Sequence, residues 1–160
     1  TETHPFRMQV VGRTTSYLNA FGEEVMVAQA DKAVAEASAL TGARVREYTE
    51  APDFMRLNRT GGHQWVIEFA KEPQAGMALF LECLDASLKR QNSDYDAKRT
   101  GGLALMAPEG TAVEKGTFDR WLRSKGKSGG QHKIPRLSNS RQLMEEVLTV
   151  AREKLVANQV

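Results

Sequence analysis

The chain has 160 residues, a length that suits one domain with a buried core of its own. Apolar residues make up 41% and charged residues 26%, and this balance argues against an intrinsically disordered chain. No apolar run approaches the roughly 18 residues of a transmembrane helix, and the polar N-terminal stretch lacks the apolar core of a signal peptide. We therefore expect a cytoplasmic globular domain that does not enter a membrane.

The histidines of the chain do not suggest a metal site. His4, His63 and His132 lie far apart in the sequence, and none has a cysteine or a carboxylate at the spacing that zinc ligands usually show. We therefore expect that this chain holds no metal.

The charge of the chain is unevenly distributed. The formal net charge is only +2, but residues 115–141 hold eight basic side chains and a single acidic one, Asp119. The rest of the chain is therefore net acidic. This asymmetry suggests that one surface meets an anionic partner.

The first third of the chain predicts two short strands and a helix. Residues 6–11 are rich in apolar side chains and end at a glycine, and residues 17–21 form a second short strand or hairpin arm. Apolar residues then recur at steps of three and four over 25–40, which is typical of an amphipathic helix, and Gly42 supplies the usual left-handed end.

The middle of the chain alternates between strand and helix patterns. One strand is limited by Pro52, and another, at 65–69, has one clearly apolar face. A long helix is expected over 77–92, followed by a short strand at 103–106.

The last third predicts two helices separated by a loop. Phe118 and Trp121 mark a short helix, and residues 126–138 form a loop rich in glycine, lysine, serine and proline. Ser140 is a plausible N-cap of a final helix with apolar residues at four-residue steps. Because strands and helices are interleaved, we predict an α/β fold in which a mixed β-sheet is covered by α-helices.

The basic loop KGKSGGQHKIPR, residues 125–136, is the most informative local segment. Its glycines let the backbone approach a ligand, and Lys133 and Arg136 offer donors suited to a phosphate or a carboxylate. Composition alone favours a solvated basic loop, with a non-specific nucleic-acid patch as a further alternative. The order of its residues is not that of a phosphate-binding P-loop.

A second segment, GRTTSYLNAFGEEV at residues 12–25, has glycines on both sides of a short polar and apolar stretch. Arg13 stands where the first predicted strand ends. Taken alone, the segment is a hairpin whose turns need glycine.

Together the two segments change the interpretation. The first resembles the post-hinge motif of acyl-adenylate-forming enzymes, with Thr15-Ser16 where Lys-Asp is usual, and its closest likeness is to the Gretchen Hagen three (auxin-responsive) family of acyl acid amido synthetases. The end of the chain is also similar to that family, in GTFDRW (116–121) and in GGQHKIPRLSN (129–139), which includes most of the basic loop. HQWVIEF (63–69) and NSDY (92–95) are similar to its bacterial members. The resemblance therefore runs over nearly the whole chain in the right order.

The resemblance implies a set of residues that act on ATP. Lys133 matches the lysine that reaches the reacting carboxylate and the α-phosphate, and it is the expected catalytic residue. Arg13 matches an arginine near the nucleotide ribose. Arg136 would either hold the loop or contact phosphate. Thr15 and Ser16 would form the hinge about which the domain swings.

The same resemblance places Asn19, Phe21 and Gly22 near the acyl end of the site during a second half-reaction, in which an amine such as an amino acid attacks the acyl-adenylate.

The resemblance also implies that residues 1–160 are the small mobile C-terminal lid, with residues 1–15 as an inter-domain hinge region. The large N-terminal domain, which would bind most of ATP, its Mg²⁺ and the acyl acid, is not in this sequence, so we expect no activity from the chain alone. An acyl-CoA ligase lid stays open as an alternative, as does a non-catalytic polyanion-binding module. Nucleic acid is not expected as a partner, because Phe118 and Trp121 stand at the helical spacing of core residues.

Overall fold

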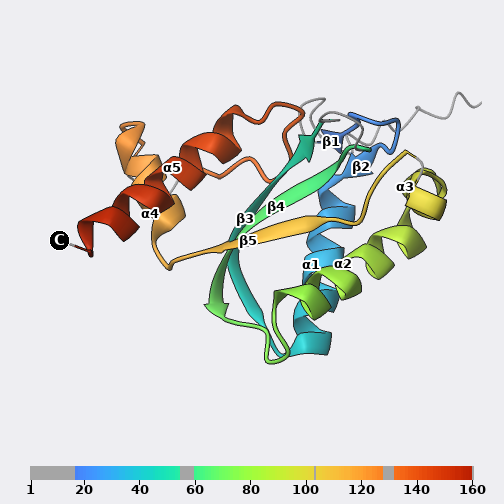
Figure 1. Cartoon of the computed structure of the whole chain (residues 1–160), viewed down its shortest axis with the longest axis horizontal. Helices are drawn as coiled ribbons and strands as arrows, with labels where there is room; N and C mark the ends of the chain where they lie inside the picture. Colours follow the sequence, from blue (N-terminus) through green and yellow to red (C-terminus); the bar gives the residue numbers. More distant parts are fainter. Residues whose placement is uncertain (1–16, 55–59, 103, 128–131, 160) are drawn as a thin grey trace, which may run out of the picture.

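The computed structural model describes residues 17–54, 60–102, 104–127 and 132–159, and its centre is a three-stranded mixed sheet (Figure 1). Strand β3 (Arg44–Asp53) pairs antiparallel with β4 (Gly62–Lys71), and β4 pairs parallel with β5 (Glu109–Val113). The strand order is therefore β3-β4-β5, and the predicted mixed sheet is confirmed.

Strand β4 is buried on both faces because it is the central strand. Trp65 and Ile67 belong to one apolar core, whereas Val66, between them, belongs to a second core on the opposite face. This division follows from the alternation of side chains along a strand. The sheet therefore separates two cores, each covered by its own helices.

Helices α1 (Val27–Thr41) and α2 (Met77–Gln91) pack side by side over the first face. Helix α1 ends at Gly42, whose φ of 69° gives the left-handed conformation that the sequence predicts. Helix α2 is followed by α3 (Ser93–Arg99), which sequence analysis did not predict, and by a 3₁₀ turn at Thr100–Gly102.

Helices α4 (Thr117–Ser124) and α5 (Gln142–Ala157) cover the second face (Figure 1). Both were predicted. Helix α5 begins at Gln142 with Arg141 in the N-cap position, so the assignment of Ser140 as N-cap is wrong. The Ser140 hydroxyl still accepts a hydrogen bond from the Gln142 N–H at 3.2 Å.

Two short strands, β1 (Tyr17–Leu18) and β2 (Val25–Met26), pair antiparallel at one end of the sheet and enclose a loop of residues 19–24. The pairing confirms a hairpin arm after residue 16. The strand predicted at 6–11 lies outside the described residues.

Two other predictions are wrong. The described residues of the predicted strand 103–106 form no strand, and the strand is β5, which lies beyond Pro108. Leu105 lies in a loop, and its side chain is fully buried in the first core, which accounts for an apolar residue at this position. Pro52 does not end β3, which continues to Asp53. It is tolerated because β3 is an edge strand, where a missing N–H costs no ladder hydrogen bond.

No helix in the described part of the chain is long and apolar enough to cross a membrane.

Candidate functional site

The basic loop between α4 and α5 runs along the outer edge of β3. The Glu50 N–H donates to the Arg136 carbonyl at 2.7 Å, and the Ser138 N–H donates to the Glu50 carbonyl at 3.0 Å. The Thr49 hydroxyl donates to the Pro135 carbonyl at 2.9 Å. The C-terminal half of the loop is therefore fixed to the sheet by backbone hydrogen bonds.

Lys133 projects from this fixed segment as an exposed cation. The next residue, Ile134, is buried in the core beneath α4 and α5, and Leu137 is buried in the core on the other face. Lys133 forms no ion pair with any residue that the structure describes. Its ammonium group is thus available to a ligand, and the residues that follow it, 134–138, are held by burial and by hydrogen bonds to β3.

A groove lies beside Lys133, between the loop, the first turns of α1 and β3. Arg136 lines the same groove, and its guanidinium donates to the Asp31 carboxylate at 2.6 Å and lies 3.5 Å from Glu47. It also stands over the Tyr48 ring, 5.4 Å from the centroid, which adds a cation–π contact. These contacts join the loop to α1 and β3, as expected of an arginine that holds the loop.

The structure brings the two motif segments together. The Asn19 N–H donates to the Asn139 side-chain carbonyl at 2.9 Å, and the Asn139 amide donates back to the Tyr17 carbonyl at 3.0 Å. The start of the 19–24 loop therefore meets the end of the basic loop, although the two lie 120 residues apart. Arg13, Thr15 and Ser16 lie outside the described residues.

Phe21 and Gly22 form the tip of the 19–24 loop. Gly22 has a φ of 82°, a left-handed conformation that favours glycine. The half-buried Phe21 ring lies 6.1 Å from the Phe54 ring and 6.3 Å from the His63 ring, measured between centroids.

A buried charged cluster, which sequence analysis did not predict, stands behind this loop. The His63 ring lies between two carboxylates, with Nε2 2.8 Å from Glu23 and Nδ1 2.6 Å from Glu50. Glu23 and Glu50 are fully buried, and His63 is 2% exposed. Strand β4 supplies the histidine, β3 supplies Glu50, and the 19–24 loop supplies Glu23.

The cluster perturbs the protonation of all three side chains. Burial by itself lowers the pKa of His63, but the carboxylates of Glu50 and Glu23 raise that pKa to about 9. Burial opposes ionisation of Glu23, but the hydrogen bond and charge of His63 leave its pKa below the usual value. For Glu50, burial prevails over the attraction of His63, so its pKa is raised.

One signal could have found His63. His63 stands two residues before Trp65 and four before Ile67. If the predicted strand is extended toward its N-terminus, His63 therefore shares their apolar face. A histidine on a buried face needs polar partners. Its glutamates, however, are distant in the sequence, and nothing in their local pattern identifies them.

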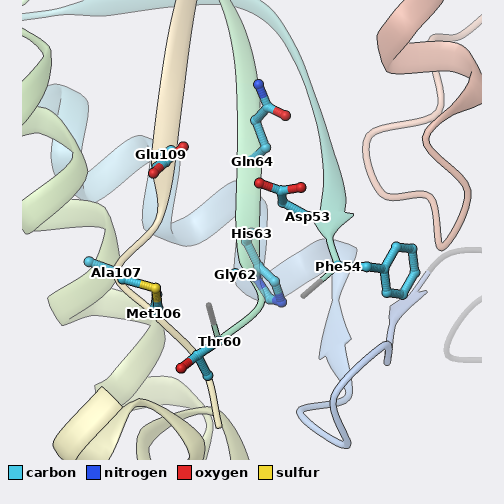
Figure 2. A pocket seen from close by; sticks show the side chains of 9 residues that line it. All are labelled: Asp53, Phe54, Thr60, Gly62, His63, Gln64, Met106, Ala107 and Glu109. Atoms are coloured by element: carbon cyan, nitrogen blue, oxygen red, sulfur yellow. The ribbon is translucent and has the colours of Figure 1, made fainter. Parts of the chain in front are cut away.

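The cluster lies beside a pocket whose lining side chains are shown in Figure 2. The end of β3, the beginning of β4 and the segment before β5 supply these residues: Asp53, Phe54, Thr60, Gly62, His63, Gln64, Met106, Ala107 and Glu109. Among the described residues, no group of three or more histidine, cysteine, aspartate or glutamate side chains is arranged to hold a metal ion.

The family of this chain is shown by its sequence, and the fold is shared with solved structures. A family model described as the GH3 family C-terminal domain matches residues 28–142. The chain therefore belongs to the GH3 family, which is the Gretchen Hagen three family that its sequence motifs resemble. No curated protein matches the chain.

Two solved structures share the fold. One is "AtGH3.15 acyl acid amido synthetase in complex with 2,4-DB", with a TM-score of 0.67, 18% identity and 87% of this chain covered. The other is "GH3.15 acyl acid amido synthetase", with a TM-score of 0.69, 20% identity and 89% of this chain covered. The chain spans about a quarter of these proteins, 26% and 27% of their lengths.

Proposed function

We propose that this chain is the mobile C-terminal lid of an ATP-dependent acyl-acid amido synthetase and that Lys133 is its catalytic residue. The observation that carries the proposal is the exposed Lys133, which has no ion-pair partner in the described part of the chain and stands just before a segment, 135–138, that is hydrogen-bonded to β3. Membership of the GH3 family supplies the reaction class.

The reaction needs a cation at this place. A substrate carboxylate attacks the α-phosphate of ATP, pyrophosphate leaves, and an acyl-adenylate forms. Both reactants are anions, so the Lys133 ammonium would offset their repulsion and stabilise the charge that builds on phosphorus. An amine, for example that of an amino acid, then attacks the acyl carbonyl, and AMP leaves as the amide forms.

The remaining predicted residues would support this chemistry. Arg13 would lie near the ribose, and Thr15 and Ser16 would act as the hinge that swings the lid between half-reactions. Arg136 would hold the loop through Asp31 and Glu47, or exchange those partners for phosphate when the lid closes.

A large N-terminal domain of the same polypeptide would complete the site. The part of this chain that aligns, 87% and 89%, makes up only 26% and 27% of the solved relatives, which are thus about three times as long and leave room for such a domain. In this proposal the same domain also holds the Mg²⁺ that accompanies ATP.

We predict that Lys133→Ala in the whole polypeptide slows acid-dependent pyrophosphate release by on the order of a hundredfold or more, because an aligned charge is lost at the reacting phosphate. The assay compares the parent with Lys133→Ala over a panel of acyl acids. Lys127→Ala is the matched control: it removes an exposed lysine from the same loop, six positions away, and should leave the rate near that of the parent.

Equal rates for Lys133→Ala and the parent would refute the assignment of Lys133. The acceptor is identified in the second half-reaction, where product formed with amino acids rather than with coenzyme A would distinguish the amide former from a thioester former.

A further inference from the structure

The loop of residues 19–24 is held by the side chain of one of its own residues. The Glu23 carboxylate accepts hydrogen bonds from the Phe21 N–H at 2.6 Å and the Ala20 N–H at 3.2 Å. The Asn19 side-chain carbonyl accepts from the Glu24 N–H at 3.3 Å. The shape of the loop therefore depends on where the Glu23 carboxylate is held.

Asn92 fixes the same loop from the helical layer. Its amide donates to the Glu23 carbonyl at 2.8 Å and to the Glu24 carbonyl at 3.3 Å. Its side-chain carbonyl accepts from the Tyr95 N–H at 2.9 Å, which caps α3. The NSDY segment thus joins the start of α3 to the 19–24 loop.

The two buried carboxylates of the cluster require a counter-charge. With Nε2 against Glu23 and Nδ1 against Glu50, a neutral imidazole would turn the lone pair of one nitrogen toward a carboxylate oxygen. An imidazolium places positive charge against both: Nε2 is hydrogen-bonded to Glu23, and Nδ1 makes a 2.6 Å ion-pair contact with Glu50 that lacks hydrogen-bond geometry. Because unpaired buried charges are costly, the protonated ring is the form that suits the Glu23 carboxylate, and it also suits Glu50 whenever that carboxyl group is ionised.

Among the residues that the structure describes, the other titratable groups around the ring do not replace this charge. The Tyr95 ring, from α3, lies 5.6 Å away between centroids, but its hydroxyl donates to Asp85 of α2 at 2.7 Å. Asp53 and Glu109, from β3 and β5, line the adjoining pocket and are acidic. The Lys98 side chain, from α3, approaches Gly22 rather than the cluster.

We propose that the buried imidazolium of His63 is a positioning residue: through Glu23 it fixes the 19–24 loop, and with it Phe21, relative to the sheet. Its meaning for the reaction rests on the proposed function, in which this loop approaches the acyl end of the site. The position of the loop itself is a property of this chain.

Phe21 is confined on a second side by Gly61. A Cβ atom at Gly61 would lie 2.4 Å from two atoms of the Phe21 ring and 2.9 Å from the Asp53 carbonyl oxygen, so only glycine leaves room for the ring. The Phe21 ring is therefore packed between Gly61, His63 and Phe54. A loop held in this way presents a pre-organised tip rather than one that must order on binding.

The test is made by NMR on this chain, without substrates. In the unsubstituted chain we expect both ring nitrogens of His63 to be protonated at about pH 7 and to lose a proton only near pH 9. Amide exchange at Ala20 and Phe21 should be protected relative to the unfolded chain. Glu23→Gln should lower that protection by about tenfold or more, because hydrogen bonds to a charged acceptor are lost.

Glu23→Gln should also lower the pKa of His63, an effect that a purely packing role would not produce. Glu24→Gln makes the same change at the exposed neighbouring position and should alter neither readout. A neutral His63 ring at about pH 7 would overturn the proposal, as would unchanged protection in Glu23→Gln. If Glu23→Gln does not fold, the His63 titration of the unsubstituted chain decides. Because no step uses ATP, failure here is distinct from failure of the proposed function.

Discussion

At the scale of single residues, the buried acidic groups of this chain each hold a segment in place. Glu68 accepts hydrogen bonds from two backbone N–H groups at the start of α4. Asp85 accepts from a tyrosine and an arginine of α3. Glu23 and Glu50 share His63. Burial of these charges is therefore accompanied by partners that join one element to another, as buried ionised groups require.

The His63 cluster predicts how stability depends on pH. Because the pKa of His63 is raised from 6.5 to about 9 by folding, the folded state holds a proton that the unfolded state releases between these values. The stabilisation is complete below about pH 6.5 and is lost as the pH rises through about 9. The free energy of unfolding should fall over this range by on the order of 3 kcal/mol.

Chemical denaturation at a series of pH values measures this fall. His63→Gln removes the titrating ring and should reduce the slope between pH 6.5 and 9. His132→Gln removes an exposed histidine and should keep the slope of the parent. A free energy of unfolding that stays constant between pH 6.5 and 9 in the unsubstituted chain would contradict a protonated His63 held between the two glutamates.

Some of these residues could be predicted from the sequence and others could not, for a physical reason. Lys133 could be singled out because it stands in a local sequence motif that resembles one of the family, and its role stays a prediction. Glu23 could not, because a glutamate after Gly22 in a polar loop has the pattern of a solvated side chain. Its burial depends on β3 and β4, which are distant in the sequence and meet it only in the folded chain.

At the scale of elements, α4 begins on the sheet rather than on a cap of its own. Its N-cap residue is Gly116, which has no side chain to accept a hydrogen bond. The Glu68 carboxylate of β4 replaces the cap, because it accepts from the Gly116 N–H at 2.7 Å and the Phe118 N–H at 3.1 Å. A negative charge at a helix N-terminus is also favourable to the helix dipole.

We predict that Glu68→Gln lowers the free energy of unfolding by about 1–2 kcal/mol, because one of the two acceptor oxygens and the charge are lost at a buried helix start. Thermal or chemical denaturation measures the loss. Glu72→Gln, an exposed substitution just after the same strand, should change stability little. Equal stability of the two variants would show that Glu68 does not cap α4.

The elements themselves could be predicted where their pattern is local. Helices α1, α2, α4 and α5 carry apolar residues at helical spacing, and all four were found. Strand β5 was missed because it lies at the edge of the sheet and most of its side chains are exposed, so it lacks an apolar alternation. The apolar run at 103–106 was taken for a strand because a buried loop residue such as Leu105 carries the same hydrophobic signal.

At the scale of the whole molecule, the fold brings several of the motif segments together at one end of the sheet, whereas GTFDRW starts α4 at Glu68 of β4. The 19–24 loop and the end of the basic loop meet at Asn19 and Asn139, and the HQWVIEF and NSDY segments hold the 19–24 loop from the sheet and from α3. Segments that are far apart in the sequence therefore meet around the 19–24 loop. The likeness to solved relatives extends over most of this chain but only about a quarter of theirs.

We propose that this chain supplies the lid of an adenylating site and that the rest of the site lies in another domain of the same polypeptide. The measurement that tests it most directly is acid-dependent pyrophosphate release from ATP by the whole polypeptide, compared with that by the 160-residue chain alone at the same molar concentration. We predict release by the whole polypeptide with at least one acid of a panel, and none above background by the chain alone. Comparable release by the chain alone would contradict the account.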